Sequence, residues 1–484
     1  MPSYNVITFG CQMNVHDSER LDEVLRAAGY RPASEPAEAD VVVLNTCSVR
    51  EKAEQKLRSE VGRLAALKRR PGGGAVLVVA GCVAQQEGRA LLKKMPALDV
   101  VVGPDNIADL PALLAEVTTG GLPVVRTVFD VDDPRFLQAG HAPVAAGPSA
   151  FLTVMKGCDE RCSFCIVPHT RGPERYRPSD EIVAEARRLT ASGVAEVVLL
   201  GQTVNSYRDP LGRLPAAPEA KPDDPDESEF ASLLRRLVAE VPELKRLRYT
   251  SPHPRHLTPS LIAAHRDLET LAEHVHMPVQ SGSDRVLKRM IRRYTRAEYV
   301  QRVGALRQAR PGLTLSTDVI VGFPGETDAE AEATVELVRE VGFCGVFGFK
   351  YSPRPYTPAL KLGDDVPEVE KSRRLSRLFE ASEELVAAQL ARLVGSAQEV
   401  LVEGPSKTAP DRLSGRTRRN EIVHIHDSGH LDLVGRLVAV DVTRANKHSL
   451  EGELTPAERA RARPAVNPPR RSLPIARSGE GPRP

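Results

Sequence analysis

Hydrophobic runs and amphipathic stretches alternate over the first 120 residues of the chain. Short apolar runs at residues 5–11, 40–47 and 76–82 each end in a cysteine, and helical patterns at 18–28 and 51–68 separate them. This spacing predicts a parallel sheet, because strands covered by helices on both faces are apolar throughout. We therefore expect a parallel α/β domain over residues 1–120.

A longer alternating region follows at residues 148–385, after a stretch at 121–147 whose Gly-Gly and Asp-Asp-Pro sequences predict a linker. The longer region predicts six strands with helices between them, near residues 150–155, 196–201, 246–250, 274–278, 314–321 and 345–351. This order favours an open, partial TIM-like barrel, whose reactive groups lie at the carboxyl ends of the strands.

The C-terminal pattern is different. Short strands at residues 398–403, 421–426 and 437–443, with Gly-, Pro- and Asp-rich turns, predict a small β-barrel over residues 386–453. Residues 454–484 are rich in Arg and Pro and are expected to form a disordered basic tail. Seven acids and five prolines at residues 209–229 predict a disordered surface insertion.

Charge and composition narrow the class of protein. The net charge is only +2, so any nucleic-acid surface must be local. One candidate is a basic patch beside the first hairpin of the predicted β-barrel, which either binds phosphates of a nucleic acid or is merely a solvated basic loop. It comprises Lys407, Arg412, Arg416, Arg418 and Arg419. No apolar run reaches the ~18 residues of a membrane span, and no signal peptide is recognised. Seven cysteines do not suit a disulfide scaffold, so we expect a cytoplasmic protein without a membrane partner.

Three cysteines, Cys158, Cys162 and Cys165, follow the first barrel strand at C-x₃-C-x₂-C spacing. Thiolates this close in sequence can converge on one soft metal or iron–sulfur site. No fourth cysteine follows, so three ligands would leave one iron of a 4Fe–4S cluster open to an outside molecule. The alternative is three unrelated thiols in a loop.

A second triplet follows from the predicted topology. Cys11, Cys47 and Cys82 come at the carboxyl ends of parallel strands, where ligand sites of open α/β sheets lie. We expect them to be neighbours in space and to share a metal site. The alternative is that they are small buried hydrophobic residues.

Other polar and glycine-rich segments also follow barrel strands, at residues 200–207, 276–283 and 321–327. Their glycines allow close approach of a ligand and their amides can bond to it, although each alone is equally typical of a turn. Without a spacing rule, we expect the nearby histidines to be ordinary polar residues; they are His253, His256, His274 and His276.

The cysteine motifs resemble those of a known family. Residues 155–165, including Phe164, resemble the signature of radical S-adenosylmethionine (SAM) enzymes. Residues 9–14, 45–52 and 81–82 are similar to the N-terminal domain of radical SAM methylthiotransferases, most of all to the branch acting on N6-isopentenyladenosine. Residues 414–420 resemble the TRAM domain, an RNA-binding barrel. The resemblance runs from about Tyr4 to Leu450.

The resemblance implies two 4Fe–4S clusters, one on Cys158, Cys162 and Cys165 that chelates SAM and one on the N-terminal triplet that handles sulfur. It leaves catalytic residues beyond the cluster ligands unidentified, and it makes the strand-end segments the SAM pocket, with expected contacts from Phe164, Gly201, Gln202, Asn205, Gly322 and Phe323. Thr203 stands where the family has Asn, and Tyr356 stands where Gly is usual.

The activity implied is transfer of a methylthio group to adenosine 37 beside the tRNA anticodon. The expected partners are the anticodon stem-loop, a low-potential electron donor and an unidentified sulfur donor. The alternatives are a relative that modifies threonylcarbamoyladenosine or a ribosomal-protein aspartate, and, in another class, a non-catalytic iron–sulfur protein that binds RNA or carries electrons.

Overall fold

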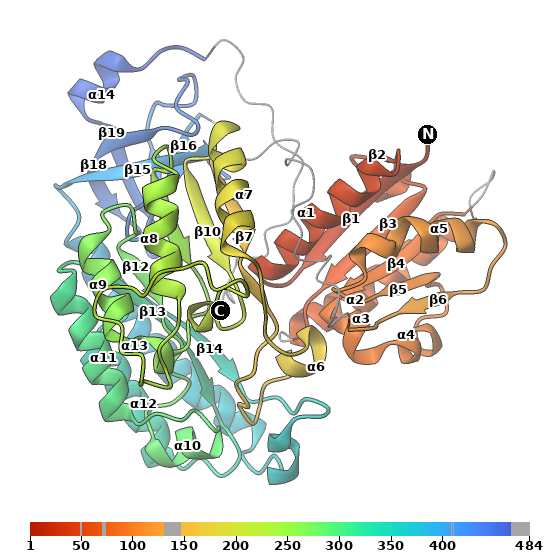
Figure 1. Ribbon diagram of the computed structural model, residues 1–484, viewed down its shortest axis with the longest axis horizontal. Coiled ribbons are helices and arrows are strands. Elements are labelled where there is room, and N and C mark those ends of the chain that lie inside the picture. Colours follow the sequence, from red (N-terminus) through yellow and green to blue (C-terminus); the bar gives the residue numbers. More distant parts are fainter. Residues whose placement is uncertain (49–50, 70–73, 130–146, 408, 410, 466–484) are drawn as a thin grey trace.

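The computed structural model describes residues 1–48, 51–69, 74–129, 147–407, 409 and 411–465, which form an N-terminal unit, a central core and a C-terminal barrel (Figure 1). The N-terminal unit is a six-stranded parallel sheet of order β2-β1-β3-β4-β5-β6. Its strands are β1 (Ser3–Phe9), β2 (Arg31–Pro32), β3 (Val41–Thr46), β4 (Val76–Gly81), β5 (Val100–Val102) and β6 (Val124–Arg126).

Helices cover both faces of this sheet, which explains its continuous apolar strands. Val41 and Val43 of β3 pack toward one face, while Val42 and Leu44 pack toward the other. The helices are α1 (Gln12–Ala27) and α5 (Leu110–Thr118) on the first face, with α2 (Glu51–Leu64), α3 (Cys82–Glu87) and α4 (Arg89–Lys94) associated with the second.

Two expectations for this unit need correction. Strand β6 lies inside the segment predicted as a linker, because its short apolar stretch completes the sheet beside β5. The remainder of that segment, residues 130–146, lies outside the described residues. Helix α1 starts six residues earlier than its apolar pattern predicts, because Cys11 and Asn14 form a capping box at its N-terminus.

The core contains the six predicted parallel strands in sequence order, as two three-stranded sheets joined by a bridge between Leu247 and Leu271. Strands β7 and β14 are the open edges, so the predicted partial barrel is confirmed. The strands are β7 (Ser149–Thr153), β10 (Glu196–Leu200), β11 (Arg246–Tyr249), β12 (His274–His276), β13 (Thr314–Val321) and β14 (Gly345–Lys350).

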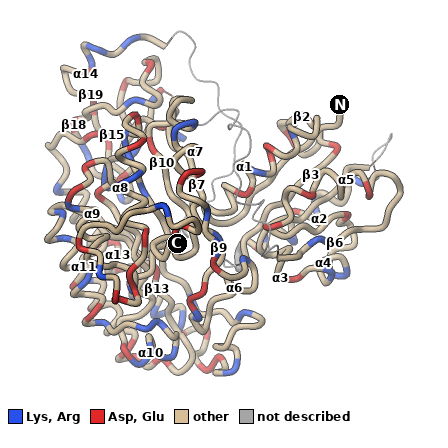
Figure 2. Tube along the Cα trace, viewed as in Figure 1, with Lys and Arg blue, Asp and Glu red and all other residues tan. Residues whose placement is uncertain are grey.

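Helices pack around these strands to form the largest apolar core of the described residues. They are α7 (Ser179–Ala191), α8 (Phe230–Glu240), α9 (Pro259–Asp267), α10 (Asp284–Arg289), α11 (Arg296–Ala309) and α12 (Asp328–Val341). Figure 2 shows basic and acidic residues interspersed over these helices, as the small net charge requires.

The acidic segment 209–229 is not disordered, and that prediction was wrong. Leu214 packs into the core. The carboxylate of Asp209 accepts hydrogen bonds from Ser179, and that of Glu227 accepts from Thr258 and Ser260 at 3.1 and 2.7 Å. Composition indicated disorder, but two of the acids, Asp209 and Glu227, are buried as hydrogen-bond acceptors.

A helix that the sequence pattern did not reveal, α13 (Glu368–Ala391), leads from the core to the C-terminal barrel. The barrel is closed, of order β15-β16-β17-β19-β18, with two strands more than predicted. Its strands are β15 (Ala397–Pro405), β16 (Leu413–Thr417), β17 (Ile422–Ile425), β18 (Leu437–Ala445) and β19 (Leu450–Leu454). The expected disordered tail begins with a short helix, α14 (Pro456–Arg461), and residues 466–484 lie outside the described residues.

The hairpin between β16 and β17 docks at the amino-terminal ends of the core strands. Arg246 of β11 is fully buried and donates to the carbonyl oxygens of Arg416 and Thr417 at 3.1 and 3.2 Å. Three arginines of the predicted basic patch lie in ion-pair range of acids there, Arg416 of Glu403, Arg418 of Glu273 and Arg419 of Glu421. Of these three side chains, only Arg418 pairs with an acid of the core, whereas Arg416 and Arg419 pair with acids of the barrel itself. In the described part of the chain, no helix is long and apolar enough to span a membrane.

Candidate active site

The three N-terminal cysteines lie at one edge of the sheet, as the strand pattern predicts. Phe9, Thr46 and Gly81 are in register across β1, β3 and β4, and each is followed within two residues by a cysteine. Cys11 caps α1, Cys47 follows β3 and Cys82 opens α3. Three thiols from distant parts of the chain therefore occupy adjacent strand ends.

Gly10 makes this close approach possible. Its φ is +141°, and a Cβ built there would lie 2.5 Å from the Cβ of Cys47 and 2.5 Å from Oδ1 of Asn14. The thiol of Cys11 donates to the same Asn14 oxygen at 3.3 Å. Burial raises the pKa of Cys82, and the nearby Cys11 thiol acts in the same direction, whereas Arg171 opposes them.

The second triplet, Cys158, Cys162 and Cys165, lies in the loop between β8 (Met155–Lys156) and α6 (Val167–Arg171), close to the N-terminal unit (Figure 1). Backbone hydrogen bonds fix this loop at both ends. The Cys158 amide donates to the Gly172 carbonyl at 3.1 Å, and the Ser163 amide donates to the Met290 carbonyl at 2.9 Å. The loop follows the first barrel strand, as predicted.

Polar groups contact two sulfurs of this loop. Arg292 is buried and donates from Nη1 to the Cys162 sulfur at 3.2 Å, while Oγ1 of Thr203 lies 3.0 Å from the Cys158 sulfur. Burial raises the pKa of Cys158, and it raises the pKa of Cys165 to about 12. Thiols in such surroundings stay protonated unless a cation or a metal stabilises the thiolate.

A buried arginine links the two cysteine sites. Arg171 is the last residue of α6, and its Nε donates to the Cys82 sulfur at 3.3 Å. Its two terminal nitrogens contact the carboxylate of Asp17 on α1 at 3.1 and 2.5 Å. The side chain of Arg171 thus holds the segment after the Cys158–Cys165 loop against Cys82 of the N-terminal triplet.

A second buried contact fixes the two units to each other. Asp105 of the N-terminal unit lies between Lys156 and Arg175, each 2.7 Å from one of its oxygens. Burial alone would raise the pKa of Asp105, but the two cations outweigh it and hold the pKa below its ordinary value. Lys156 and Arg175 belong to β8 and β9 (Arg175–Tyr176), the short hairpin on either side of the cysteine loop.

The donor sets of both sites suit iron–sulfur clusters. Among the residues that the structure describes, no three His, Cys, Asp or Glu side chains gather tightly enough to hold a single metal ion. A 4Fe–4S cluster instead takes one thiolate per iron, so its ligands surround the cluster rather than meet at one ion. Each site offers three thiols, and arginines donate to Cys82 and Cys162, so the residues present fit such a group.

The expected SAM contacts fall into two groups. Phe164 packs against the apolar cluster that contains Phe323, and Phe323 is fully buried with its ring 5.2 Å from that of Tyr351. Gly322 has φ +68°, and its amide donates to Glu326 at 2.6 Å. Phe164, which precedes Cys165 in the chain, therefore shares one apolar cluster with Phe323.

The second group lies beside Cys158. Gly201 permits close packing, because a Cβ there would lie 2.6 Å from Met155. Gln202 accepts from the Gly157 amide, while its buried Nε2 has no hydrogen-bond partner among the residues that the structure describes and remains available as a donor. The amide of Asn205 is fully buried and bonds both backbone groups of His253, at 2.7 and 2.9 Å. The side chain of Asn205 therefore connects the loop after β10 to the loop after β11.

The two departures from the family pattern have structural explanations. Thr203 contacts Cys158 directly, as described above. Tyr356 has φ +66°, a left-handed conformation that favours glycine, and its exposed ring lies 5.6 Å from that of His169. The backbone is thus strained at Tyr356, and the Tyr356 ring adds an aromatic surface beside α6.

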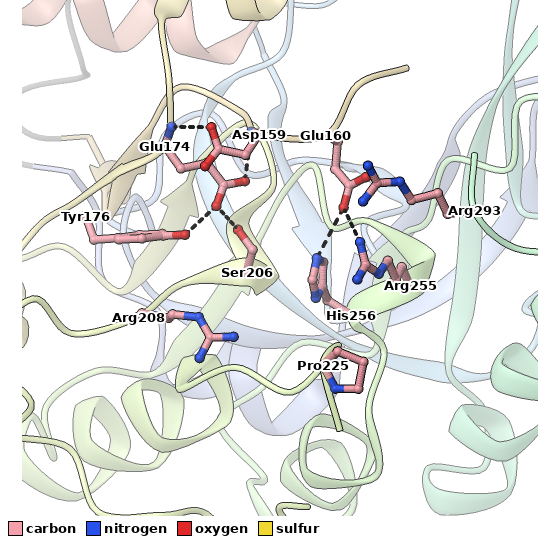
Figure 3. A pocket seen from close by; sticks show the side chains of 10 residues that line it. All are labelled: Asp159, Glu160, Glu174, Tyr176, Ser206, Arg208, Pro225, Arg255, His256 and Arg293. Carbon is pink, nitrogen blue, oxygen red and sulfur yellow. Dashed lines mark hydrogen bonds and ion pairs between the residues drawn. The ribbon is translucent and has the colours of Figure 1, made fainter. Parts of the chain in front are cut away.

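Two cavities flank the cysteine loop. One of about 210 Å³ is polar and contains both signs of charge (Figure 3). In it, Glu174 accepts from Ser206 at 2.8 Å, and Glu160 lies 3.5 Å from His256 and from Arg255. The other, of about 420 Å³, is lined by Cys158, Asp159, Glu160, Arg161, Pro168 and Pro173.

Sequence reasoning missed three buried charged residues around the two cysteine sites. Arg171, Arg292 and Asp105 belong to no metal-binding motif, and their partners are far away in sequence. The four histidines form ordinary hydrogen bonds, as expected; His274 and His276, for example, both contact Ser316.

Comparison with known families shows that the chain contains a radical SAM domain. Residues 3–103 match an uncharacterized protein family, UPF0004; residues 152–338 match the radical SAM superfamily; and residues 391–455 match the TRAM domain. A solved radical SAM methyltransferase from Kitasatospora setae, TsrM, with cobalamin and a [4Fe-4S] cluster bound, shares the fold with a TM-score of 0.50. It is 16% identical, and the alignment covers 74% of each chain.

Curated relatives then give the family. A tRNA-2-methylthio-N(6)-dimethylallyladenosine synthase of Sorangium cellulosum is 67% identical over 99% of this chain and 100% of its own length. The proteins of that name from Leptothrix cholodnii and Neisseria gonorrhoeae are 45% and 44% identical, over 92% and 93% of this chain and 92% and 98% of their own lengths. The chain belongs to the tRNA-2-methylthio-N(6)-dimethylallyladenosine synthase family.

Proposed function

We propose that this chain transfers a methylthio group to C2 of N6-isopentenyladenosine at position 37 of tRNA, beside the anticodon, by radical SAM chemistry. The observation that carries the proposal is the facing of two three-cysteine sites across α6, where Arg171 reaches Cys82. The names of relatives that match over nearly the full length of the chain support the same activity. Two adjacent sites suit a reaction that needs both a radical and an inserted sulfur.

Cys158, Cys162 and Cys165 are assigned to a 4Fe–4S cluster that binds SAM, and Cys11, Cys47 and Cys82 to a second 4Fe–4S cluster. When bound, these groups would supply the 5′-deoxyadenosyl radical and the sulfur to be inserted, and another SAM molecule would supply the methyl group. An aromatic C–H has no acidic proton for a general base, so a cofactor must supply this chemistry.

The residues of the chain would bind and orient these groups. Arg292 and Arg171 donate to Cys162 and Cys82 and stabilise thiolate charge in a buried environment. The free Nε2 of Gln202 is a donor for a SAM carboxylate or ribose. Phe164, Gly322 and Phe323 would contact the adenosine, and Gly201 and Asn205 hold the adjoining loops.

The C-terminal barrel is assigned to the tRNA, by its match to the TRAM domain. Arg418 of the β16–β17 hairpin pairs with Glu273 of the core, and Arg416 and Arg419 pair with acids of the barrel, so we expect other barrel residues to provide most of the phosphate contacts. A low-potential electron donor and a sulfur donor complete the partners. The N-terminal unit, with β6 added to residues 1–120, carries the second cluster, and residues 148–385 carry the first.

Two measurements test the assignment. Anaerobically reconstituted protein should hold about eight irons per chain, and replacing Cys11, Cys47 and Cys82 by Ala should remove about half while SAM cleavage persists. A triple variant that keeps one intact cluster but no longer cleaves SAM would refute this division of roles.

The substrate is tested with anticodon stem-loops. We expect 2-methylthio product on stem-loops that carry the isopentenyl group and little on unmodified or threonylcarbamoylated ones. Burial of the apolar tail gives roughly 10- to 200-fold discrimination against the bare base. Preferential turnover of the threonylcarbamoylated stem-loop would favour the sister activity, and absence of 5′-deoxyadenosine would favour a non-catalytic protein.

A further inference from the structure

Two large aromatic side chains on β14 are exposed on the inner side of the partial barrel that the core strands form. Phe347 is 48% exposed and Phe349 is 38% exposed. The alternate residues of the strand face the helices: Val346 packs into the main core, and Lys350 bonds Glu368 and Ser372 of α13. Because side chains alternate along a strand, both phenylalanines face the concave inner side of the half-barrel.

The neighbours of the two rings define this inner face. Phe347 pairs in register with Asp318 of β13, and Phe349 pairs with Ile320. The ring of His276 stands edge-on to Phe347, at 5.6 Å and 72°, and its Nε2 lies 3.3 Å from Asp318. An apolar surface with a polar pair at its border has the composition of a site for a flat heteroaromatic ligand.

The inner face is continuous with the radical site. Ile320 packs against the same apolar cluster as Phe164, which immediately precedes Cys165. At the opposite end, the β16–β17 hairpin closes the barrel against Arg246. Solvent reaches this face, since both phenylalanine side chains are exposed. Within the described residues, the inner face of β14 is therefore both exposed to solvent and connected, through Ile320 and Phe164, to the cysteine loop.

Chemistry on a base inside an RNA loop requires that the base be unstacked and held, and aromatic side chains commonly replace the lost stacking. We propose that Phe347 and Phe349 form the platform that holds the isopentenyl-bearing adenine of the substrate. The proposal rests on the proposed function and extends it by assigning base recognition to the inner face of β14. The face of Phe347 would stack on the purine, and the two rings together would enclose the apolar tail.

The test compares Phe347→Ala and Phe349→Ala with Phe347→Tyr, which keeps an aromatic face. Val346→Ala is the matched control, because it weakens the same strand on the side that faces the helices. Iron content and thermal melting of the reconstituted protein verify that each variant is folded. The readouts are Kd for fluorescent stem-loops with and without the isopentenyl group, 5′-deoxyadenosine formed from SAM without RNA, and 2-methylthio product.

We expect each Ala variant to weaken binding of the isopentenylated stem-loop about tenfold or more, the loss typical of one stacking side chain. Preference over the unmodified stem-loop should shrink with it, while Phe347→Tyr and Val346→Ala stay near the wild type. SAM cleavage without RNA should not change.

Two results would overturn the inference. Ala variants with unchanged Kd and preference would show that the rings do not hold the base, and loss of SAM cleavage without RNA would show that they hold the adenosine of SAM instead. Wild-type protein that forms no methylthio product on any stem-loop would refute the proposed function; the binding preference is measured separately and still tests the platform.

Discussion

Replacing Arg171 by Met should release the cysteine loop from the N-terminal unit. The side chains of Arg171 and Asp17 are only 3% and 8% exposed, so removing one leaves the other charge buried without its partner. Breaking a buried pair in this way costs about 3–5 kcal/mol. At 1.4 kcal/mol for each tenfold change, local opening of α6 and α1 should become about 140- to 3,700-fold more frequent.

Hydrogen exchange measured by mass spectrometry reports this opening directly, on proteins compared at equal iron content. Arg187→Ala is the matched control, because its pair with Glu240 is 54% and 37% exposed and contributes about 0–1 kcal/mol. The double variant Asp17→Leu with Arg171→Met should recover much of the protection, since no unpaired charge remains. Exchange in Arg171→Met no faster than in the control would refute this reasoning.

Two further outcomes follow from buried groups. Burial lowers the pKa of His16 to about 3, so the stability that its neutral form contributes is complete above about pH 6.5 and is lost as the pH falls toward 3. The free energy of unfolding, measured by urea denaturation, should therefore fall by about 2 kcal/mol between pH 7 and pH 5. The fall should be smaller in His16→Gln. Gly10→Ala should cost about 1–3 kcal/mol and reduce iron retention at the N-terminal site, whereas Gly193→Ala, with φ +96° and open space around it, should leave iron retention unchanged in the same assay.

The sequence predicted the sheets because their strands are apolar and their order is simple. The placement of Cys11, Cys47 and Cys82 at one edge follows from parallel strands alone, and the register of β1, β3 and β4 confirms it. Residues Val49 and Arg50 of the motif used to choose the branch lie outside the described residues.

The errors have a common physical origin. Composition marked residues 209–229 as disordered, yet the carboxylate of Glu227 is a specific acceptor for hydroxyls of a distant loop. Arg418 indicated a phosphate site, yet its carbonyl accepts from the Glu273 amide at 3.0 Å and its guanidinium lies near the same residue. Such pairings depend on tertiary contacts, which a one-dimensional pattern does not contain.

The docking of the β16–β17 hairpin sets a length scale for the whole enzyme. It contacts the amino ends of the core strands through Arg246, whereas the cysteine loop lies beyond their carboxyl ends. The longest core strand, β13, has eight residues and therefore measures about 26 Å. An RNA that contacts both this hairpin and the cysteine loop would therefore span about that length of the core.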